Sequence, residues 1–179
     1  MDILASVQKN YPAIHTAAGE FLGKLTGSNI TTDICLAGEM AGLMLLRSSK
    51  ADLRNIPPGT VILGAIADDV QQAMHRFVFG MAMSNGLNPK EVDFAAMSAD
   101  AKKYLPQLTQ FEKPFRDTCD NYGIVSELFP FIAVAAGVKL VLAGNQLKLL
   151  SPKIGLAMLF FHIIAGSKTA PYPPTIERS

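Results

Sequence analysis

The chain has 179 residues, of which 49% are hydrophobic and only 17% are charged, and its mean hydropathy is +0.25. Soluble domains usually carry about 25% charged residues, and intrinsic disorder needs low hydrophobicity with high net charge, so disorder is excluded. A formal net charge of +1 gives no electrostatic reason to expect a nucleic-acid partner. Two cysteines exclude a disulfide scaffold, and the length predicts one domain with its own hydrophobic core.

Apolar residues recur at helical spacing from the start of the chain. The first of them form a heptad seam with alternating steps of three and four: Leu4, Val7, Tyr11, Ile14, Ala18, Phe21 and Leu25. Pro12 lies inside this seam, so either a helix begins there, with Asn10 or Tyr11 as its cap, or one helix bends.

Further helices follow along the chain. One runs to about Ser48, and the next is predicted at about 60–85, where Gly86 is expected to end it. An Asn-Pro sequence then indicates a new helix start at residue 88. Pro106 and Pro114 are expected to break or bend the helical segment that contains them.

The last third of the chain is its most apolar part and its only basic part. Apolar helices are predicted at 124–143 and 154–166. Residues 124–179 carry five basic and two acidic side chains, whereas 1–123 carry 11 basic and 13 acidic ones. This combination is typical of a segment near a membrane, although core helices with lysines at their ends share it. The tail at 167–179 is rich in proline and is predicted to be extended.

Together these elements predict an all-α fold: one compact bundle of about five to seven helices at 1–166, followed by the extended tail at 167–179. The apolar pair at 124–166 has two interpretations. A membrane span needs about 20 mostly apolar residues, and 123–143 has that length but contains Glu127, Pro130 and Lys139. The pair is therefore either a buried part of the bundle or a membrane hairpin with lysines in its turn.

Glu39 is the most unusual polar residue, because its helix is apolar on every other side from 34 to 46. A carboxyl group there must be paired, neutral or facing water. The structural interpretation pairs it with a Lys, Arg or Tyr at a gap between helices, or places it on the one exposed stripe of its helix. The functional interpretation makes it a proton-transfer group or a metal ligand. Gly38 and Gly42 flank it with a spacing that lets another helix approach closely.

A second group of polar residues lies at helical spacing. Asp68, Gln72 and His75 share one helix face, which could hold a metal or form a solvated stripe that meets a polar partner. Metal sites in helical bundles use a Glu-x-x-His spacing, which the chain lacks, so no metal and no cofactor is predicted. His162 lies in an apolar run and is predicted to be a satisfied core residue.

Both cysteines, Cys35 and Cys119, are predicted to be small buried hydrophobes. Asp117 and Asp120 lie close to Cys119 in sequence and would raise the pKa of its thiol, which argues against a reactive thiolate. No basic segment followed by an apolar run begins the chain, so a reducing, cytoplasmic setting is expected, with membrane association as an alternative.

The function expected from these features is non-catalytic interaction or assembly, with a protein partner or a second copy of the chain. Gly38 and Gly42 would supply a close helix contact, and the tail would dock on a neighbour through Pro171, Tyr172, Pro173 and Pro174. Two alternatives are binding of an apolar small molecule or lipid, with Glu39 or His162 as the polar anchor, and membrane contact through 124–166. An enzyme would require Glu39, Asp68 and His75 to converge in space.

Overall fold

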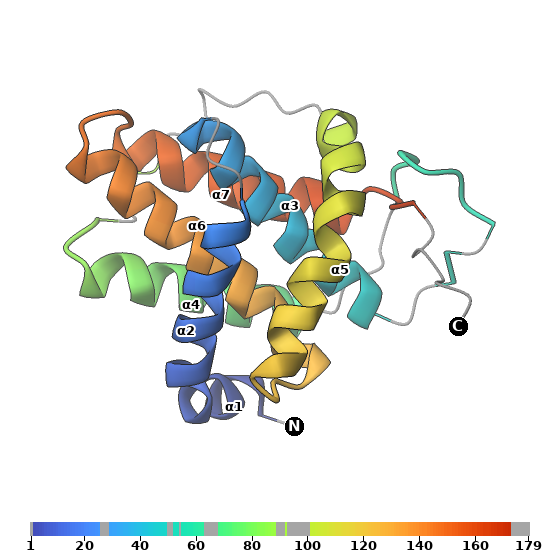
Figure 1. Ribbon diagram of the computed structural model, residues 1–179, viewed down its shortest axis with the longest axis horizontal. Coiled ribbons are helices and arrows are strands. Elements are labelled where there is room, and N and C mark those ends of the chain that lie inside the picture. Colours follow the sequence, from blue (N-terminus) through green and yellow to red (C-terminus); the bar gives the residue numbers. More distant parts are fainter. Residues whose placement is uncertain are drawn as a thin grey trace.

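The computed structural model describes residues 2–25, 29–49, 52–53, 55–62, 68–88, 92 and 101–172. These residues form an all-α fold, which confirms the fold class expected from the sequence (Figure 1). Its elements in chain order are α1 (Ile3–Lys9), α2 (Tyr11–Lys24), α3 (Ile30–Ser48), α4 (Asp68–Ser84), the 3-10 helix η3 (Ala101–Tyr104), α5 (Leu105–Asn121), the 3-10 helix η4 (Ser126–Leu128), α6 (Phe129–Gln146) and α7 (Pro152–Ser167).

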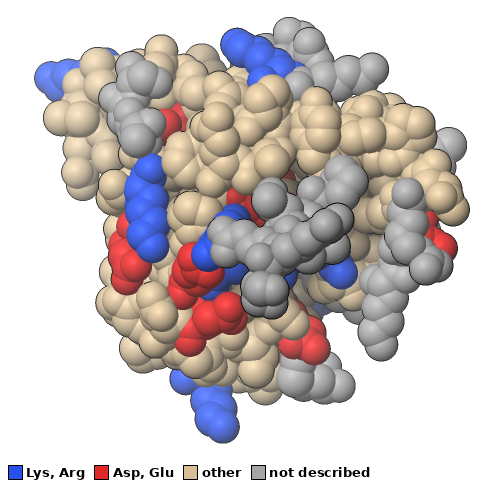
Figure 2. All heavy atoms as spheres, turned by 45° about the vertical axis from the view of Figure 1, so that its right-hand side comes forward, with Lys and Arg blue, Asp and Glu red and all other residues tan. Residues whose placement is uncertain are grey.

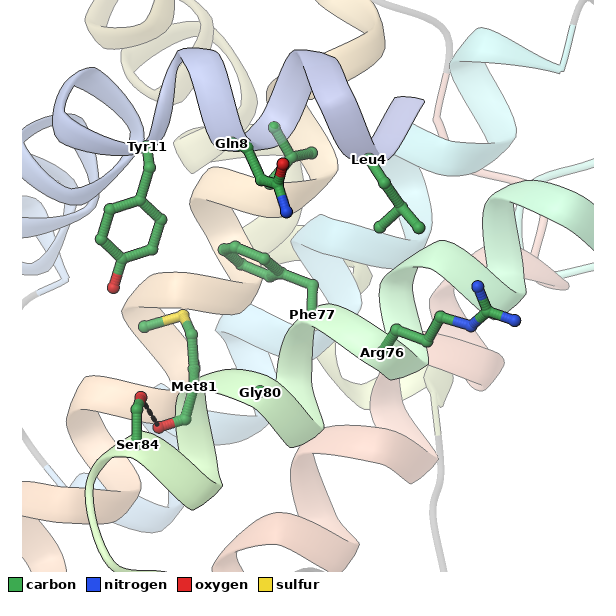
Figure 3. A pocket seen from close by; sticks show the side chains of 9 residues that line it. Leu4, Gln8, Tyr11, Arg76, Phe77, Gly80, Met81 and Ser84 are labelled. Carbon is green, nitrogen blue, oxygen red and sulfur yellow. Dashed lines mark hydrogen bonds between the residues drawn. The ribbon is translucent and has the colours of Figure 1, made fainter. Parts of the chain in front are cut away.

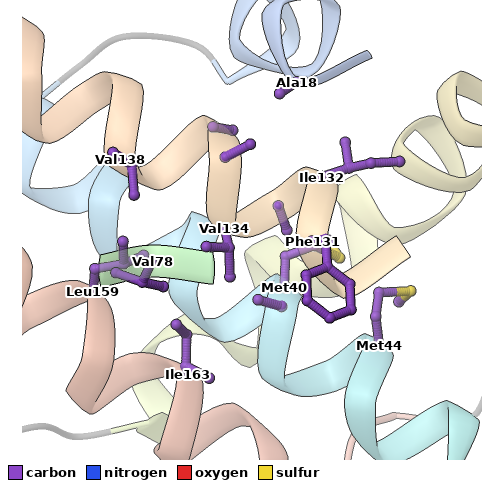
Figure 4. Packing of buried hydrophobic residues seen from close by; sticks show 14 of the residues in the cluster. Ala18, Met40, Met44, Val78, Phe131, Ile132, Val134, Val138, Leu159 and Ile163 are labelled. Carbon is purple, nitrogen blue, oxygen red and sulfur yellow. The ribbon is translucent and has the colours of Figure 1, made fainter. Parts of the chain in front are cut away.

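Helix α3 is the centre of the bundle. Every residue from Asp33 to Leu46 is buried, as the apolar sequence of this helix predicts. It packs most extensively against α7 and α6, and α6 packs in turn against α2 and α4. Figure 4 shows side chains of α3, α4, α6 and α7 meeting in this core, among them Met40, Phe131 and Leu159.

Local chemistry explains where several helices begin and end. Asp2 caps α1 by accepting hydrogen bonds from the backbone N–H groups of Leu4 and Ala5. The Asn10 side chain bonds back to the Ser6 carbonyl, and Pro12 occupies the first turn of α2, so a new helix begins there. Gly86 follows α4 with a φ of +76°, which confirms it as the residue that ends the helix.

Two expectations about helix bounds change, and a third falls on residues that are not described. Pro114 lies inside α5 and does not break it, while Pro106 sits in the first turn of that helix, where proline is tolerated. The described part of the helix expected at about 60–85 begins at Asp68. Pro89, in the Asn-Pro helix start expected at residue 88, lies outside the described residues.

Glycines let α3 and α7 approach each other at backbone contact. A Cβ atom on Gly38 would lie 2.8 Å from the His162 Cβ and 2.9 Å from the Leu159 carbonyl oxygen, and one on Gly166 would lie 2.5 Å from the Glu39 carbonyl oxygen. A Cβ on Gly42 would overlap backbone atoms of α7. Gly38 and Gly42 therefore stand at a close helix contact, and the helix that they contact belongs to the same chain.

The described start of the tail lies on its own chain as well. Backbone hydrogen bonds of 2.7–2.8 Å join 59–62 to 168–170, and Val61 and Thr169 form an isolated β-bridge. Arg47, at the end of α3, donates a hydrogen bond of 2.9 Å to the Tyr172 carbonyl. Pro171 is half-buried, and Pro173 and Pro174 lie outside the described residues.

Charge is sparse on the surface. Most of the face in Figure 2 is neither acidic nor basic, and its charged groups lie largely in clusters of mixed sign. One group of mixed sign is joined by hydrogen bonds: Glu112 accepts two from Arg47 and one from Arg116, each of 3.2 Å. It ties α3 to α5.

One described segment, Ser126–Gln146, is long and apolar enough to cross a membrane, with a mean hydropathy of 1.8. Within the bundle 72% of it is buried against other helices. Lys139, the charged residue of α6, donates a hydrogen bond of 2.8 Å to the His15 carbonyl on α2. Length and composition alone therefore allow membrane association, while the packing gives this helix a place in the protein core.

The helix contact leads to a stability prediction. Gly42→Ala should lower the free energy of unfolding by about 3 kcal/mol or more, because the added methyl group meets α7 backbone rather than a movable side chain. The matched control is Gly23→Ala in α2, where a Cβ meets nothing within 4 Å and should stabilise the helix by about 0.5 kcal/mol. Urea denaturation of both variants checks this; equal stability of the two would contradict the close contact.

Candidate functional site: a buried polar cluster and an apolar groove

Glu39 meets His162 at the contact between α3 and α7. The His162 Nδ1 atom lies 2.7 Å from Glu39 Oε1, and the side chains of His162 and Glu39 are 7% and 1% exposed. Glu39 was expected to pair with a Lys, Arg or Tyr if it had a structural role, so the identity of its partner corrects that expectation. The prediction that His162 is a satisfied core residue agrees with this hydrogen bond.

Two further titratable side chains adjoin the pair. Cys35 lies one helical turn before Glu39, and its thiol interacts with both His162 and Tyr104. The Tyr104 ring stacks edge-on against the His162 imidazole, with 5.1 Å between ring centroids and 88° between planes. Helices α3 and α7 and the 3-10 helix η3 thus bring Cys35, Glu39, Tyr104 and His162 into one buried cluster.

Burial and the partners of this cluster favour retention of a proton. Burial raises the pKa of the Glu39 carboxyl, and the hydrogen bond from His162 opposes that shift. Burial lowers the pKa of His162, but the interactions with Cys35 and Glu39 outweigh it and raise the pKa to about 9. Both shifts favour one proton retained in the 2.7 Å contact between Nδ1 and Oε1, and a pair that holds one proton carries no net charge.

The cluster has the residue types of a nucleophilic triad: a thiol, an imidazole and a carboxyl group that orients it. Its accessibility is against that use, because the four residues are between 1% and 8% exposed. A substrate would reach Cys35 only if helices separated. Chemically, the cluster is suited to storing a proton and joining α3 to α7.

The polar face predicted on α4 does not join this cluster by any contact that the described residues show. Gln72 is exposed, and His75 packs edge-on against the Phe160 ring, with centroids 5.4 Å apart and a pKa lowered by burial. Asp68 begins α4, and its side chain lies outside the described positions. The enzyme hypothesis needed Glu39 beside His75, and the structure pairs Glu39 with His162 instead.

A groove between α1 and α4 is the second candidate site. Its volume is about 670 Å³, and it is lined by Leu4, Val7, Gln8, Tyr11, Arg76, Phe77, Gly80, Met81 and Ser84. In Figure 3 the side chains of Leu4, Gln8 and Tyr11 extend toward α4, Phe77 lies near the middle, and Arg76 extends outward at one side. The Ser84 hydroxyl donates to the Met81 carbonyl at 3.0 Å, which leaves Gln8, Tyr11 and Arg76 as the polar groups available to a ligand.

Sequence reasoning missed the partners of Glu39 and the whole groove. The pairing had a signal, because Glu39 and His162 are each an isolated polar residue in an apolar helix, and two such residues can satisfy each other. Cys35 also precedes Glu39 by four residues and therefore shares its helix face. The sequence offers almost no indication of the groove, because the groove forms only where α1 and α4, which are far apart in the sequence, lie side by side.

The second cysteine agrees with its prediction. Cys119 is fully buried in α5, and burial first, then Asp120, raises the pKa of its thiol to about 12.

Among the described residues, no three His, Cys, Asp or Glu side chains gather where they could hold a metal ion. No family model matches the chain, and no similar curated protein or solved structure is found, so its chemistry is argued from this geometry.

The buried pair predicts a pH-dependent stability. The folded state raises the pKa of His162 from 6.5 to about 9, so its contribution is complete below pH 6.5 and is lost as the pH rises toward 9. The loss should be about 3 kcal/mol. In Glu39→Gln the imidazole keeps the effect of burial and its interaction with Cys35 but loses the carboxylate, so this decline should become smaller. Urea denaturation at pH 6, 7.5 and 9 measures it; the same decline in both proteins would contradict the pairing.

Proposed function

We propose that this protein binds an elongated apolar molecule with an anionic end group, and that the groove between α1 and α4 is the binding site. The observation that carries the proposal is the groove itself, which joins apolar walls to an exposed arginine. This is one of the two alternatives that the sequence left beside assembly.

The dimensions and lining of the groove suit a small molecule. Small-molecule sites usually have volumes of about 300–1,000 Å³ and mostly apolar walls with a few polar groups that fix orientation. The groove has about 670 Å³, and Leu4, Val7, Phe77 and Met81 supply apolar walls. Gly80 adds no side chain, so the floor at this point is open backbone of α4.

Arg76 supports an anionic end group. It is exposed on α4, and in Figure 3 its guanidinium lies beside Leu4, toward one end of the groove. Ion pairs among the described residues include those of Lys24, Arg47, Lys113 and Arg116. The structure shows no such pair for Arg76 with a described residue, so its guanidinium is available to a carboxylate or phosphate.

Assembly with a protein partner is the second candidate, and it has one supporting observation. Phe79 and Met83 lie on the outer face of α4 and are 36% and 65% exposed. Apolar side chains exposed together often belong to an interface. The features that first suggested assembly, Gly38, Gly42 and the start of the tail, make contacts within the chain, so the groove is the better supported site.

A fluorescent fatty acid tests the groove. The purified protein should bind cis-parinaric acid, and Gly80→Leu should weaken binding at least tenfold because the new side chain fills the groove. Gly23→Leu is the control, since a Cβ there also meets nothing within 4 Å, but on α2 away from the groove. Arg76→Gln should weaken binding of the acid several-fold and leave binding of the corresponding alcohol unchanged.

Two outcomes would contradict the proposal: no binding by the unmodified chain, or equal losses in Gly80→Leu and Gly23→Leu. If binding is absent and light scattering gives a dimer that Met83→Ser converts to a monomer, assembly is the function that the evidence favours.

A further inference from the structure

The turn between α6 and α7, residues 147–151, and the first turn of α7 present apolar side chains that the fold does not use. Leu147 and Leu149 are each 65% exposed, and Ile154 is 36% exposed. The intervening Leu150 points the other way, because it lies against Gly144 and Gly155, where added Cβ atoms would meet its side chain at 3.3 and 3.0 Å. Leu150 thus supplies the internal packing of the turn, and Leu147 and Leu149 face solvent.

The turn is also held in one conformation. Backbone N–H groups of Lys148, Leu149 and Leu150 donate to the carbonyls of Asn145 and Gly144 at 2.9–3.2 Å. The turn lies at the edge of the molecule, where α6 and α7 meet (Figure 1). Leu147 and Leu149 therefore form a preorganised apolar tip, which loses little conformational entropy when it binds another surface.

Lys148 occupies a position where the backbone favours glycine. Its φ is +56°, and among the described residues it is the one non-glycine residue with a positive φ. Glycines stand at the same position, two residues past the helix end, after α4 (Gly86) and α5 (Gly123). A lysine in the left-handed region is less stable than a glycine there. A residue kept at such a cost points to a use for its side chain outside the fold.

Along the chain, the charge of the tip has one sign. Lys148 and Lys153 are exposed, and the sequence from 128 to 176 contains no aspartate or glutamate. Across space, the first turn of α3 adjoins Gly144 through Ile30, and its acidic residue, Asp33, is buried at 7% exposure. Exposed leucines beside exposed lysines match the two parts of an anionic bilayer surface: acyl chains below and acidic headgroups above. A protein partner of ordinary composition would not require this absence of acids.

We propose that the α6–α7 turn docks the folded protein on anionic membrane surfaces, with Leu147 and Leu149 inserted among the lipids and Lys148 at the headgroups. In this arrangement α6 stays packed in the bundle and does not span the bilayer. The site is separate from the α1–α4 groove, so either proposal can hold without the other.

Vesicle flotation of the full chain tests the docking surface. The protein should float with vesicles of phosphatidylcholine containing about a third phosphatidylserine and bind vesicles of phosphatidylcholine alone much more weakly. The double variant Leu147→Ser with Leu149→Ser should lower the partition coefficient at least tenfold and keep the helical circular dichroism spectrum, since both side chains are exposed. Met83→Ser is the matched control, because Met83 on α4 is also 65% exposed, and it should bind as the unmodified chain does.

Lys148→Gly separates a role in binding from a role in folding. It should raise the melting temperature, because glycine suits the positive φ, and weaken binding to the anionic vesicles several-fold. A merely structural lysine would give no loss of binding. Gly80→Leu, which fills the groove, should bind vesicles normally.

Three results would overturn the proposal. One is failure of the unmodified chain to float with either vesicle, and another is an equal loss of binding in Met83→Ser and the double leucine variant. The third is resistance of the bound protein to carbonate extraction, because that would show a spanning helix in place of surface docking.

Discussion

The contact between α3 and α7 is the constraint on which the rest of the structure depends. Gly38, Gly42 and Gly166 remove the side chains that would otherwise separate the two backbones. The two backbones are in contact on either side of Glu39, which is 1% exposed. A carboxylate sealed in this way needs a partner inside the protein, and His162 on the facing helix provides it.

This contact also determines where function can be located. The core is built on α3, α6 and α7 and contains few charged side chains. The thiol of Cys35, the carboxyl group of Glu39 and the imidazole of His162 are all buried within it. The surfaces left for recognition lie elsewhere: the groove between α1 and α4, and the turn between α6 and α7. The groove combines apolar walls with Arg76, and the turn combines exposed leucines with Lys148, so both suit amphipathic molecules with acidic groups.

The sequence predicted the features that depend on local chemistry. The apolar run at 34–46 predicted a buried helix, Gly86 a helix end, and Gly38 with Gly42 a close helix contact, because each follows from spacing along one segment. Pairing across space was harder. Glu39 and His162 are 123 residues apart, and helical spacing within either segment does not reveal the other. The contact made by Gly38 and Gly42 was expected to serve assembly, because a glycine pattern does not state which helix it will meet.

The most direct test of the central claim is the pKa of the His162 imidazole, followed by heteronuclear NMR of the ring nitrogens across pH 5–10. The interactions of the imidazole with Cys35 and Glu39 predict a pKa of about 9, far above the value for a free imidazole, and Glu39→Gln should lower that pKa. A value at or below 6.5, or a value that Glu39→Gln leaves unchanged, would contradict the pairing, because burial without a charged partner lowers the pKa of a histidine.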